Sequence, residues 1–285
     1  MEITSELVYQ LITEQFYNWH DLEITPVSHS GNDNRTFHLG TKMTVRLPSA
    51  KRYVSQIEKE AKWLPFLAKH LTLPISKPIA IGKPNNNYPY PWSINQYIEG
   101  IPLNQTSVDK VTLAKELAAF LKQLQQIDIK DAPLAEKHNF FRGANPIVYH
   151  DQVEATLKQQ KDLPVTKLKN LWQQAIDAEY EQEPVWLHGD IAPGNLLIKN
   201  GHLCGVIDFG IMAVGDPACD YAMAWTYFDR QSRPYFLAGL DQGMIMRARG
   251  WALWKALITY DDVNEEIAKN AKDTINEILK EEEMK

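Results

Sequence analysis

The N-terminal part of the chain alternates hydrophobic and polar positions in the way that strands do. Residues 36–39 and 43–47 alternate on either side of Gly40, which predicts a β-hairpin. A helix is expected from about Tyr53, because apolar residues then recur at spacings of three or four: Val54, Ile57, Ala61, Leu64 and Leu67. Pro65 lies inside this pattern and predicts a kink or a break.

A loop and a short strand close this strand-rich part. Residues 83–91 are rich in Asn and Pro, which favours a surface connection between two strands. Residues 92–98 are typical of a strand, and residues 99–102, Glu-Gly-Ile-Pro, interrupt it. We therefore predict an N-terminal lobe over residues 1–98 and a second lobe over residues 99–285.

The second lobe has mainly helical periodicity. The run Thr106-Ser-Val-Asp109 fits a capping box before an apolar stripe. The stripe is expected to face the core, and it consists of Leu113, Leu117, Leu121, Leu124 and Ile127. Residues 153–180 and 244–285 are also expected to be helical.

A second hairpin is predicted around Asn200-Gly201, a dipeptide that favours a type I′ turn between two apolar runs. If Lys199 faces His202 in this hairpin, Asn195 faces Val206. Asp208 then lies on the same face as Asn195 as its diagonal neighbour, with the Cβ atoms roughly 7–8 Å apart. Asp190 precedes Asn195 by five residues, at the mouth of the same hairpin.

Two carboxylates and an amide at one end of a hairpin suit phosphoryl transfer. Hard oxygen ligands select Mg²⁺ over zinc, and a further carboxylate must orient or accept the proton of the attacking hydroxyl. The pattern His-x-Asp, four residues, Asn, and then a separate Asp-Phe-Gly has the spacing of a kinase catalytic loop and its metal-binding motif.

These segments resemble the aminoglycoside phosphotransferase family, small-molecule kinases with a protein-kinase-like fold. The residues that carry the resemblance are His188-Gly-Asp-Ile-Ala-Pro-Gly-Asn195, Ile207-Asp-Phe-Gly210 and Gly215-Asp-Pro-Ala-Cys-Asp220, and it extends from about Val27 to Trp254. It implies an α+β, bilobal fold. An N-terminal lobe with an antiparallel sheet and a helix binds nucleotide, and a larger, mainly helical C-terminal lobe carries the catalytic hairpin.

The resemblance also implies roles for single residues. Asp190 resembles the catalytic base, and Asn195 and Asp208 resemble the metal ligands. His188 resembles the residue that supports the catalytic loop. Asp220 resembles the buried carboxylate that accepts backbone hydrogen bonds from that loop, although a helix N-cap is an alternative interpretation.

Two segments of the N-terminal lobe resemble parts of a nucleotide site. Gly31 and Asn34 lie where a phosphate-covering loop would expose backbone N–H groups, although the segment also suits an ordinary turn. Gln96 and Ile98 lie at the position of the hinge between the lobes, where backbone groups meet the purine.

The phosphate-binding position of the kinase-like strand is occupied by Arg46 instead of the commoner lysine. Its expected partner is Glu60 on the following helix, with Glu58 as the rival. Lys42, expected on the same strand face as Arg46, is an alternative phosphate ligand. A surface ion pair between Arg46 and Glu60 is the simpler interpretation.

The acceptor is expected to be a small hydroxyl compound. Protein kinases often carry a lysine two residues after the catalytic aspartate, where this chain has Ala192, and no Ala-Pro-Glu motif follows Asp208. Aromatic and acidic residues after Asp220 would suit a cationic amino sugar but also suit core packing. They are Trp225, Tyr227, Asp229, Trp251 and Trp254.

Composition and charge exclude several other classes. Of the 285 residues, 30 are Lys or Arg and 36 are Asp or Glu, a net charge of −6 without the basic excess that binding to a nucleic acid polymer requires. The two cysteines form neither a disulfide framework nor a zinc motif. The acidic N-terminus and the lack of a long apolar run predict a cytoplasmic protein without membrane contact, as a monomer or a weak homodimer.

We therefore expect an enzyme that moves the γ-phosphate of ATP or GTP, with Mg²⁺, to a hydroxyl of a small molecule. Aminoglycosides, macrolides, choline-like amino alcohols, homoserine and sugars remain open as acceptors. A nucleotide-binding module without catalysis is an alternative, and so is a metal-dependent hydrolase that uses His188 and Asp190.

Overall fold

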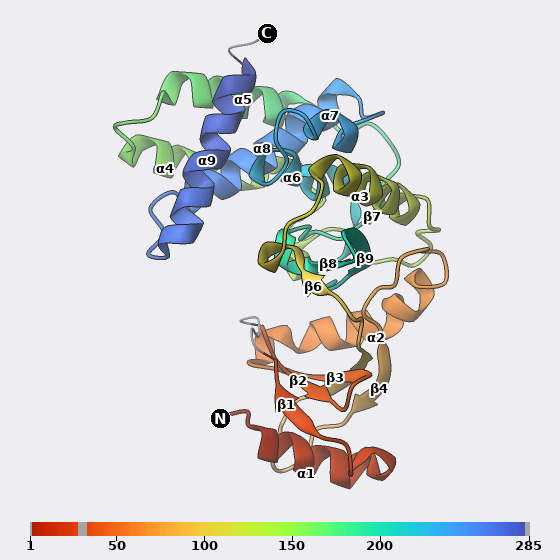
Figure 1. The fold of residues 1–285 in the computed structure, drawn as a ribbon. Helices are drawn as coiled ribbons and strands as arrows, with labels where there is room; N and C mark the ends of the chain where they lie inside the picture. The colour runs from red at the N-terminus through yellow and green to blue at the C-terminus, as the bar shows by residue number, and fades with distance from the viewer. Residues whose placement is uncertain (1, 28–32, 283–285) are drawn as a thin grey trace. The chain divides into compact units, whose positions relative to one another are not determined.

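The chain forms two compact units in the computed structural model, which describes residues 2–27 and 33–282. The first unit consists of Met1–Gly100 and the short segment Cys204–Gly210, and the second of Ile101–Leu203 and Ile211–Lys285 (Figure 1). The sequence placed the lobe boundary after Ile98 and had no signal for the return of the later segment to the first unit.

The first unit contains an antiparallel sheet with the strand order β1-β2-β3-β5-β4. Its strands are β1 Ile24–Pro26, β2 Asn34–Leu39, β3 Met43–Pro48, β4 Pro78–Gly82 and β5 Trp92–Gln96. The predicted hairpin around Gly40 and the predicted loop between two strands are both confirmed. In the central strand β3, Arg46 lies opposite Thr36 on one side and Ser93 on the other.

Two helices accompany this sheet. Helix α1, Ser5–Gln15, is capped by Thr4 and contributes Val8, Leu11 and Ile12 to the core below the sheet. Helix α2, Val54–Leu67, continues past Pro65, so of the kink or break that we predicted, the break does not occur.

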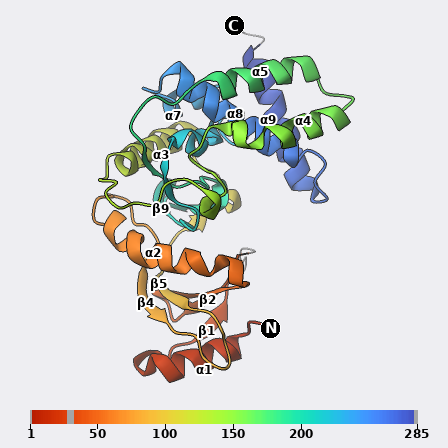
Figure 2. The ribbon, with the colours of Figure 1, turned by 180° about the vertical axis from the view of Figure 1, so that it is seen from behind.

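The second unit is mainly helical, as expected (Figure 2). Its helices are α3 Lys110–Gln125, α4 His150–Gln159, α5 Val165–Asp177, α6 Met223–Thr226, α7 Arg233–Phe236, α8 Gln242–Ile258 and α9 Glu265–Glu282. Each of the two long helical regions predicted from the sequence is divided into two helices. The predicted capping box at Thr106 is wrong, because Asp109 caps α3 through its bond from the Thr112 N–H.

Short strands in the second unit position the predicted catalytic segment. Strand β7, Val185–Leu187, pairs with β10, Ala213–Gly215, and β6, Ile101–Pro102, pairs with β8, Leu196–Lys199. Strand β9, His202–Val206, follows β8 in the same sheet. The boundary between the two units falls within β9, after Leu203. The turn between them has φ of 54° at Asn200 and 80° at Gly201, as a type I′ turn requires.

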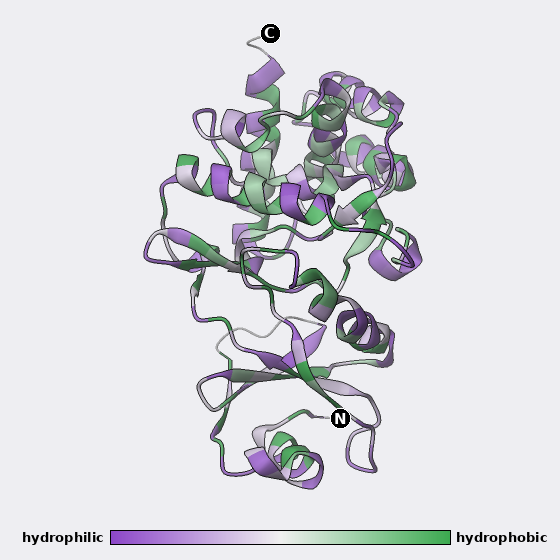
Figure 3. Cartoon of the chain, turned by 90° about the vertical axis from the view of Figure 1, so that its right-hand side faces the viewer, coloured by the Kyte–Doolittle hydropathy of each residue, from purple (hydrophilic) through white to green (hydrophobic). Residues whose placement is uncertain are grey.

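Most helices carry both hydrophobic and hydrophilic residues, which Figure 3 shows as green and purple along the same ribbon. Helix α8 differs, because its buried residues surround it on all sides: they include Arg247, Trp251 and Trp254. No helix in the described part of the chain combines the length and the apolar composition needed to cross a bilayer.

Helices α5 and α8 approach closely at Gly250. A Cβ atom placed on Gly250 would lie 2.5 Å from the Cβ of Ala175. This distance is too short for two carbon atoms, so the glycine sets the spacing of the two helices.

We expect Gly250→Ala to lower the free energy of unfolding by up to about 2 kcal/mol. The cost of overpacking, about 1–3 kcal/mol, exceeds the gain in helix propensity of about 1 kcal/mol. Adding Ala175→Gly should remove the contact and recover part of the loss, measured as a coupling in a double-mutant cycle of urea unfolding. Additive effects of the two substitutions would contradict this explanation.

Candidate active site

Asp190 and Asn195 lie together in the loop between β7 and β8. The Nδ2 of Asn195 donates to the Asp190 backbone oxygen at 2.9 Å and to its Oδ2 at 3.1 Å. A short 3₁₀ helix, Pro193–Asn195, turns the chain so that the amide reaches back over the loop. The Asp190 side chain is exposed, so a reactant can reach this carboxylate.

The backbone of this loop is held by one buried carboxylate. The N–H of His188 donates to Oδ2 of Asp220 and the N–H of Gly189 donates to Oδ1, both at 2.7 Å. Asp220 is 1% exposed. Burial raises the pKa of the Asp220 carboxyl, against these hydrogen bonds, which favour its charged form.

Asp220 therefore accepts hydrogen bonds from the loop and does not cap a helix. Asp216 caps the 3₁₀ helix Pro217–Tyr221 by accepting from the Ala218 N–H at 3.1 Å, so the N-cap interpretation of Asp220 is wrong. Asp216 is also bound by the buried Arg247, whose Nε donates to its Oδ2 at 2.7 Å. The sequence carried no local signal for Arg247.

His188 and Gly189 are both required by the shape of the loop. The His188 side chain is fully buried, and its Nδ1 accepts from the Asp190 N–H at 3.1 Å. Gly189 has φ of 86°, and a Cβ atom there would lie 2.8 Å from the Ile211 backbone oxygen. The imidazole thus helps to fix the backbone at Asp190, while the glycine provides the left-handed turn before it.

In the first unit, Arg46 bridges two carboxylates. Its Nη1 lies 3.1 Å from both oxygens of Glu60, and its Nη2 lies 3.0 Å from Oδ1 of Asp208. Glu60 is 1% exposed, whereas the rival Glu58 is exposed. The contact between Arg46 and Asp208 was not foreseen from the sequence.

The charges in this group depend on one another. Burial alone would lower the pKa of Arg46, but the carboxylates of Glu60 and Asp208 raise it above its ordinary value, so Arg46 is charged. Burial raises the pKa of Glu60, and Arg46 opposes that rise. The group is thus a buried ion pair and not the surface pair of the simpler interpretation.

Asp208 leads a short segment with a constrained backbone. Its φ is 64°, and the following Phe209 is 1% exposed. Gly210 packs against Gln56 of α2, whose Nε2 donates to Asp33 at 3.2 Å. Asp208 belongs to the first unit and Asn195 to the second, and their joint binding of a metal stays a prediction.

The remaining residues predicted for the nucleotide have different surroundings. Gly31 lies outside the described residues, and Asn34 is buried at the start of β2. The Gln96 N–H donates to the Lys77 oxygen at 3.0 Å at the end of β5. Ile98 packs beside Gly205.

Lys42 does not share a strand face with Arg46, contrary to our expectation. It lies in the turn before β3, and its side chain is exposed. Its backbone oxygen accepts from the Tyr97 N–H at 2.9 Å. The strand begins only at Met43, so the alternation assumed for Lys42 does not extend to it.

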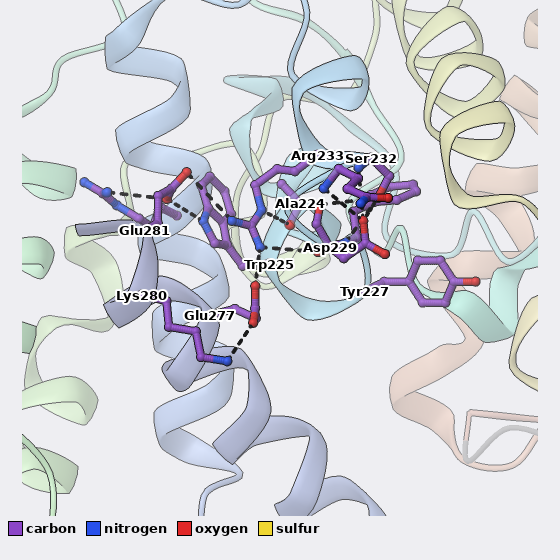
Figure 4. Close-up of polar contacts among 12 residues, drawn as sticks. Ala224, Trp225, Tyr227, Asp229, Ser232, Arg233, Glu277, Lys280 and Glu281 are labelled. Atoms are coloured by element: carbon purple, nitrogen blue, oxygen red, sulfur yellow. Dashed lines mark hydrogen bonds and ion pairs between the residues drawn. The ribbon is translucent and has the colours of Figure 1, made fainter. Parts of the chain in front are cut away.

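Most aromatic residues proposed for the acceptor are buried. Trp225 and Trp251 are 2% exposed and Trp254 is 5% exposed, which favours core packing. The Trp225 Nε1 donates to Glu281 at 2.8 Å, within a polar group that joins α9 to α6 and α7 (Figure 4). Asp229 caps a turn by accepting from the Ser232 N–H at 3.0 Å.

Tyr227 lies beside Asp229 (Figure 4), and Lys110 contacts both residues. The Nζ of Lys110 is 3.6 Å from Oδ2 of Asp229, and it lies 5.1 Å from the centre of the Tyr227 ring. The Asp229 carboxylate is thus already paired with Lys110.

Solved structures with the same fold are aminoglycoside and macrolide kinases. The GDP complex of aminoglycoside 2′-phosphotransferase-IIIa has a TM-score of 0.77 at 18% identity, covering 96% of this chain and 98% of that chain. The ternary complex of streptomycin, ATP and APH(2″)-IIa has a TM-score of 0.61 at 21% identity, covering 97% of both chains.

The macrolide 2′-phosphotransferase MphH from Brachybacterium faecium has a TM-score of 0.64 at 17% identity, covering 95% of this chain and 97% of that chain. Among curated protein sequences, none matches this chain. The fold and the loop define a small-molecule kinase with a protein-kinase-like fold.

The chain belongs to the phosphotransferase enzyme family, whose profile matches residues 23–257. This confirms the family resemblance that the three sequence segments indicated.

We expect Asp220→Asn to loosen the loop at residues 188–190. An amide has one acceptor oxygen, so its NH₂ group would face one of the two buried N–H donors, at a cost of about 1–3 kcal/mol. Hydrogen exchange of the His188 and Gly189 amides should become faster, with no comparable change in the paired strands β7 and β10. Unchanged protection of those two amides would rule out this role for Asp220.

Proposed function

We propose that this enzyme transfers the terminal phosphate of a purine nucleoside triphosphate to a hydroxyl of a small molecule, with Asp190 as the catalytic base. The observation that carries the proposal is the loop geometry: an exposed Asp190 carboxylate on a backbone held by Asp220 and His188. An accessible carboxylate on a fixed loop is what phosphoryl transfer needs to orient an attacking hydroxyl.

Asp190 is suited to accept the proton of that hydroxyl. One of its oxygens, Oδ2, receives a hydrogen bond from Asn195 at 3.1 Å, which limits rotation of the carboxylate. The other oxygen, Oδ1, is left to bind the hydroxyl. His188 is fully buried, so it supports the loop from within and is not placed to touch a reactant.

Asn195 and Asp208 would hold Mg²⁺. The Nδ2 of Asn195 is used by Asp190, which leaves the amide oxygen for a cation. Asp208 is exposed and has one oxygen on Arg46, so its second oxygen remains. A carboxylate oxygen and an amide oxygen are hard ligands of the kind that suits Mg²⁺. Bound Mg²⁺ would neutralise charge on the phosphates.

Arg46 supplies fixed positive charge in the nucleotide-binding unit. Because Glu60 binds its Nη1 through both carboxylate oxygens, the guanidinium is held in one orientation. We propose that Arg46 attracts the phosphates and positions Asp208 through its Nη2. The related solved structures contain GDP or ATP, and either purine nucleotide suits the proposal.

We expect Asp190→Ala to reduce phosphoryl transfer by about 10²–10⁴-fold, the usual contribution of a positioned base, while nucleotide binding persists. Transfer is measured by mass spectrometry as a gain of one phosphate over a panel of hydroxyl metabolites and antibiotics. Nucleotide binding is measured by thermal shift with ADP and GDP.

Asp162→Ala is the matched control, because Asp162 is an exposed aspartate in the loop between α4 and α5. It should leave the rate unchanged. Full turnover by the Asp190 variant would remove Asp190 from the role of base. Absence of nucleotide consumption by the wild type across the whole panel would favour a binding module instead.

A further inference from the structure

Arg142 stands in an aromatic cage within the second unit. Its guanidinium carbon lies 4.5 Å from the ring centre of Trp254, 5.0 Å from that of Trp251 and 6.0 Å from that of Tyr149. We refer to these four residues as the Arg142 cage. Cation–π attraction explains why a charged group is stable there.

The three rings of the cage support one another. Tyr149 stacks on Trp254 with the ring centres 4.2 Å apart, and Trp251 meets Trp254 edge-on at 5.7 Å. The Tyr149 hydroxyl donates to the Phe140 oxygen at 2.8 Å, and the Trp254 Nε1 donates to Gln152 at 2.9 Å. These ring faces would suit a cationic substrate, but they already contact the guanidinium of Arg142.

The charge of Arg142 has no carboxylate partner. Across the residues that the structure describes, no acidic side chain lies within ion-pair distance of it, and its buried Nη1 lacks a hydrogen-bond acceptor. The Nε1 of Trp251, also in the cage, is a second buried donor without an acceptor. Buried donors are nearly always satisfied in folded proteins, by protein, water or ligand.

Three buried arginines of the same unit are each paired with a carboxylate, although the Nε of Arg249 is also a buried donor without an acceptor. Arg233 pairs with Glu277, Arg247 with Asp216, and Arg249 with Glu282. Each of these guanidinium groups joins two elements of the fold through a carboxylate. Arg142 differs from all three, and an anion from outside the chain would complete its contacts.

The backbone before Arg142 is held in an uncommon conformation. Phe140 and Phe141 have φ of 54° and 55°, in the left-handed region that non-glycine residues rarely adopt. The fully buried Asn139 supports this turn, since its Nδ2 donates to the Arg142 oxygen at 2.5 Å. Such conformations persist where the surroundings hold them and are enriched at ligand sites.

Arg142 also lies next to the catalytic loop. A Cβ atom placed on Gly189 would be 3.4 Å from the Cβ of Arg142, and Gly189 directly precedes Asp190. Arg142 is partly exposed, so a ligand can meet the accessible part of its side chain, whereas Nη1 itself is buried. A group held by Arg142 would therefore be bound by the same unit as Asp190.

We propose that Arg142 binds an oxyanion group of the acceptor, a carboxylate or a phosphate, so that the acceptor is an anionic hydroxyl compound and not a polycation. The planar guanidinium fork suits either oxyanion. The placement of this group as part of the acceptor rests on the proposed function, whereas the oxyanion site itself does not.

The site is tested first by binding without turnover. Inorganic phosphate is titrated at constant ionic strength, and tryptophan fluorescence is recorded, because Trp251 and Trp254 contact the guanidinium. We expect a saturable change in the wild type that is lost in Arg142→Gln and kept in Arg142→Lys. Arg230→Gln is the matched control, since Arg230 is an exposed arginine of the same unit, and it should respond as the wild type does.

An equal response of the wild type and Arg142→Gln, or no response of the wild type, would overturn the site. Circular dichroism checks that each variant is folded. If Arg142→Gln is unfolded, Arg142→Met, which fills the cage without charge, takes its place against Arg142→Lys.

The role toward the acceptor is tested with pairs that differ in one anionic group, glycerate against glycerol and gluconate against glucose. We expect the acids to be phosphorylated with at least tenfold higher kcat/KM. Arg142→Gln should remove this preference mainly through KM, while kcat changes little. Turnover of aminoglycosides or neutral compounds with no effect of Arg142→Gln would overturn the inference and leave the proposed function intact. A phosphate response without turnover of any compound would support the oxyanion site and contradict the proposed function.

Discussion

The carboxylate of Asp220 is the contact on which the candidate active site depends. It is buried, and each of its oxygens accepts one backbone N–H of the loop, from His188 and from Gly189. A buried carboxylate needs such donors, and the loop needs an acceptor for N–H groups that no strand pairs. The carboxylate and the loop therefore satisfy each other's hydrogen-bonding groups, and these bonds fix the backbone that leads to Asp190.

The same helical turn ties the loop to the rest of its unit. Asp216 caps the turn that carries Asp220 and receives the guanidinium of Arg247 from α8. Charge-assisted hydrogen bonds therefore tie this turn to α8 through Asp216 and to the loop at residues 188–189 through Asp220. Because each member is buried, loss of one leaves a polar group unsatisfied, and this makes the loop rigid and sensitive to substitution.

Arginines serve two different purposes in this protein. Arg46, Arg233, Arg247 and Arg249 pair with carboxylates and join segments far apart in the sequence. Arg142 instead has aromatic faces around it and no carboxylate among the described residues. The related aminoglycoside kinases share the fold at 18–21% identity, a distance at which the acceptor is decided by such local differences and not by the scaffold.

The local structure was predictable from the sequence to a large extent. Alternation around Gly40 and the turn at Asn200-Gly201 defined two hairpins, because side-chain period and turn chemistry act over a few residues. Breaks within long helical patterns were missed: a short loop, residues 160–164, separates α4 from α5. The predicted cap of α3 lies too early in the sequence, because both Thr106 and Asp109 are good cap residues and Asp109 is the one used.

Motif spacing singled out Asp190, Asn195, Asp208 and Asp220 as candidate site residues, and it indicated the family that the profile match shows. Only the tertiary structure decided which distant residues meet: Asp208 with Arg46, Asp216 with Arg247, and Arg142 with Trp251 and Trp254. Aromatic residues spaced as on a helix suit core and ligand equally in a sequence. The difference depends on which charged side chain folds against them, and that is a property of the packed chain.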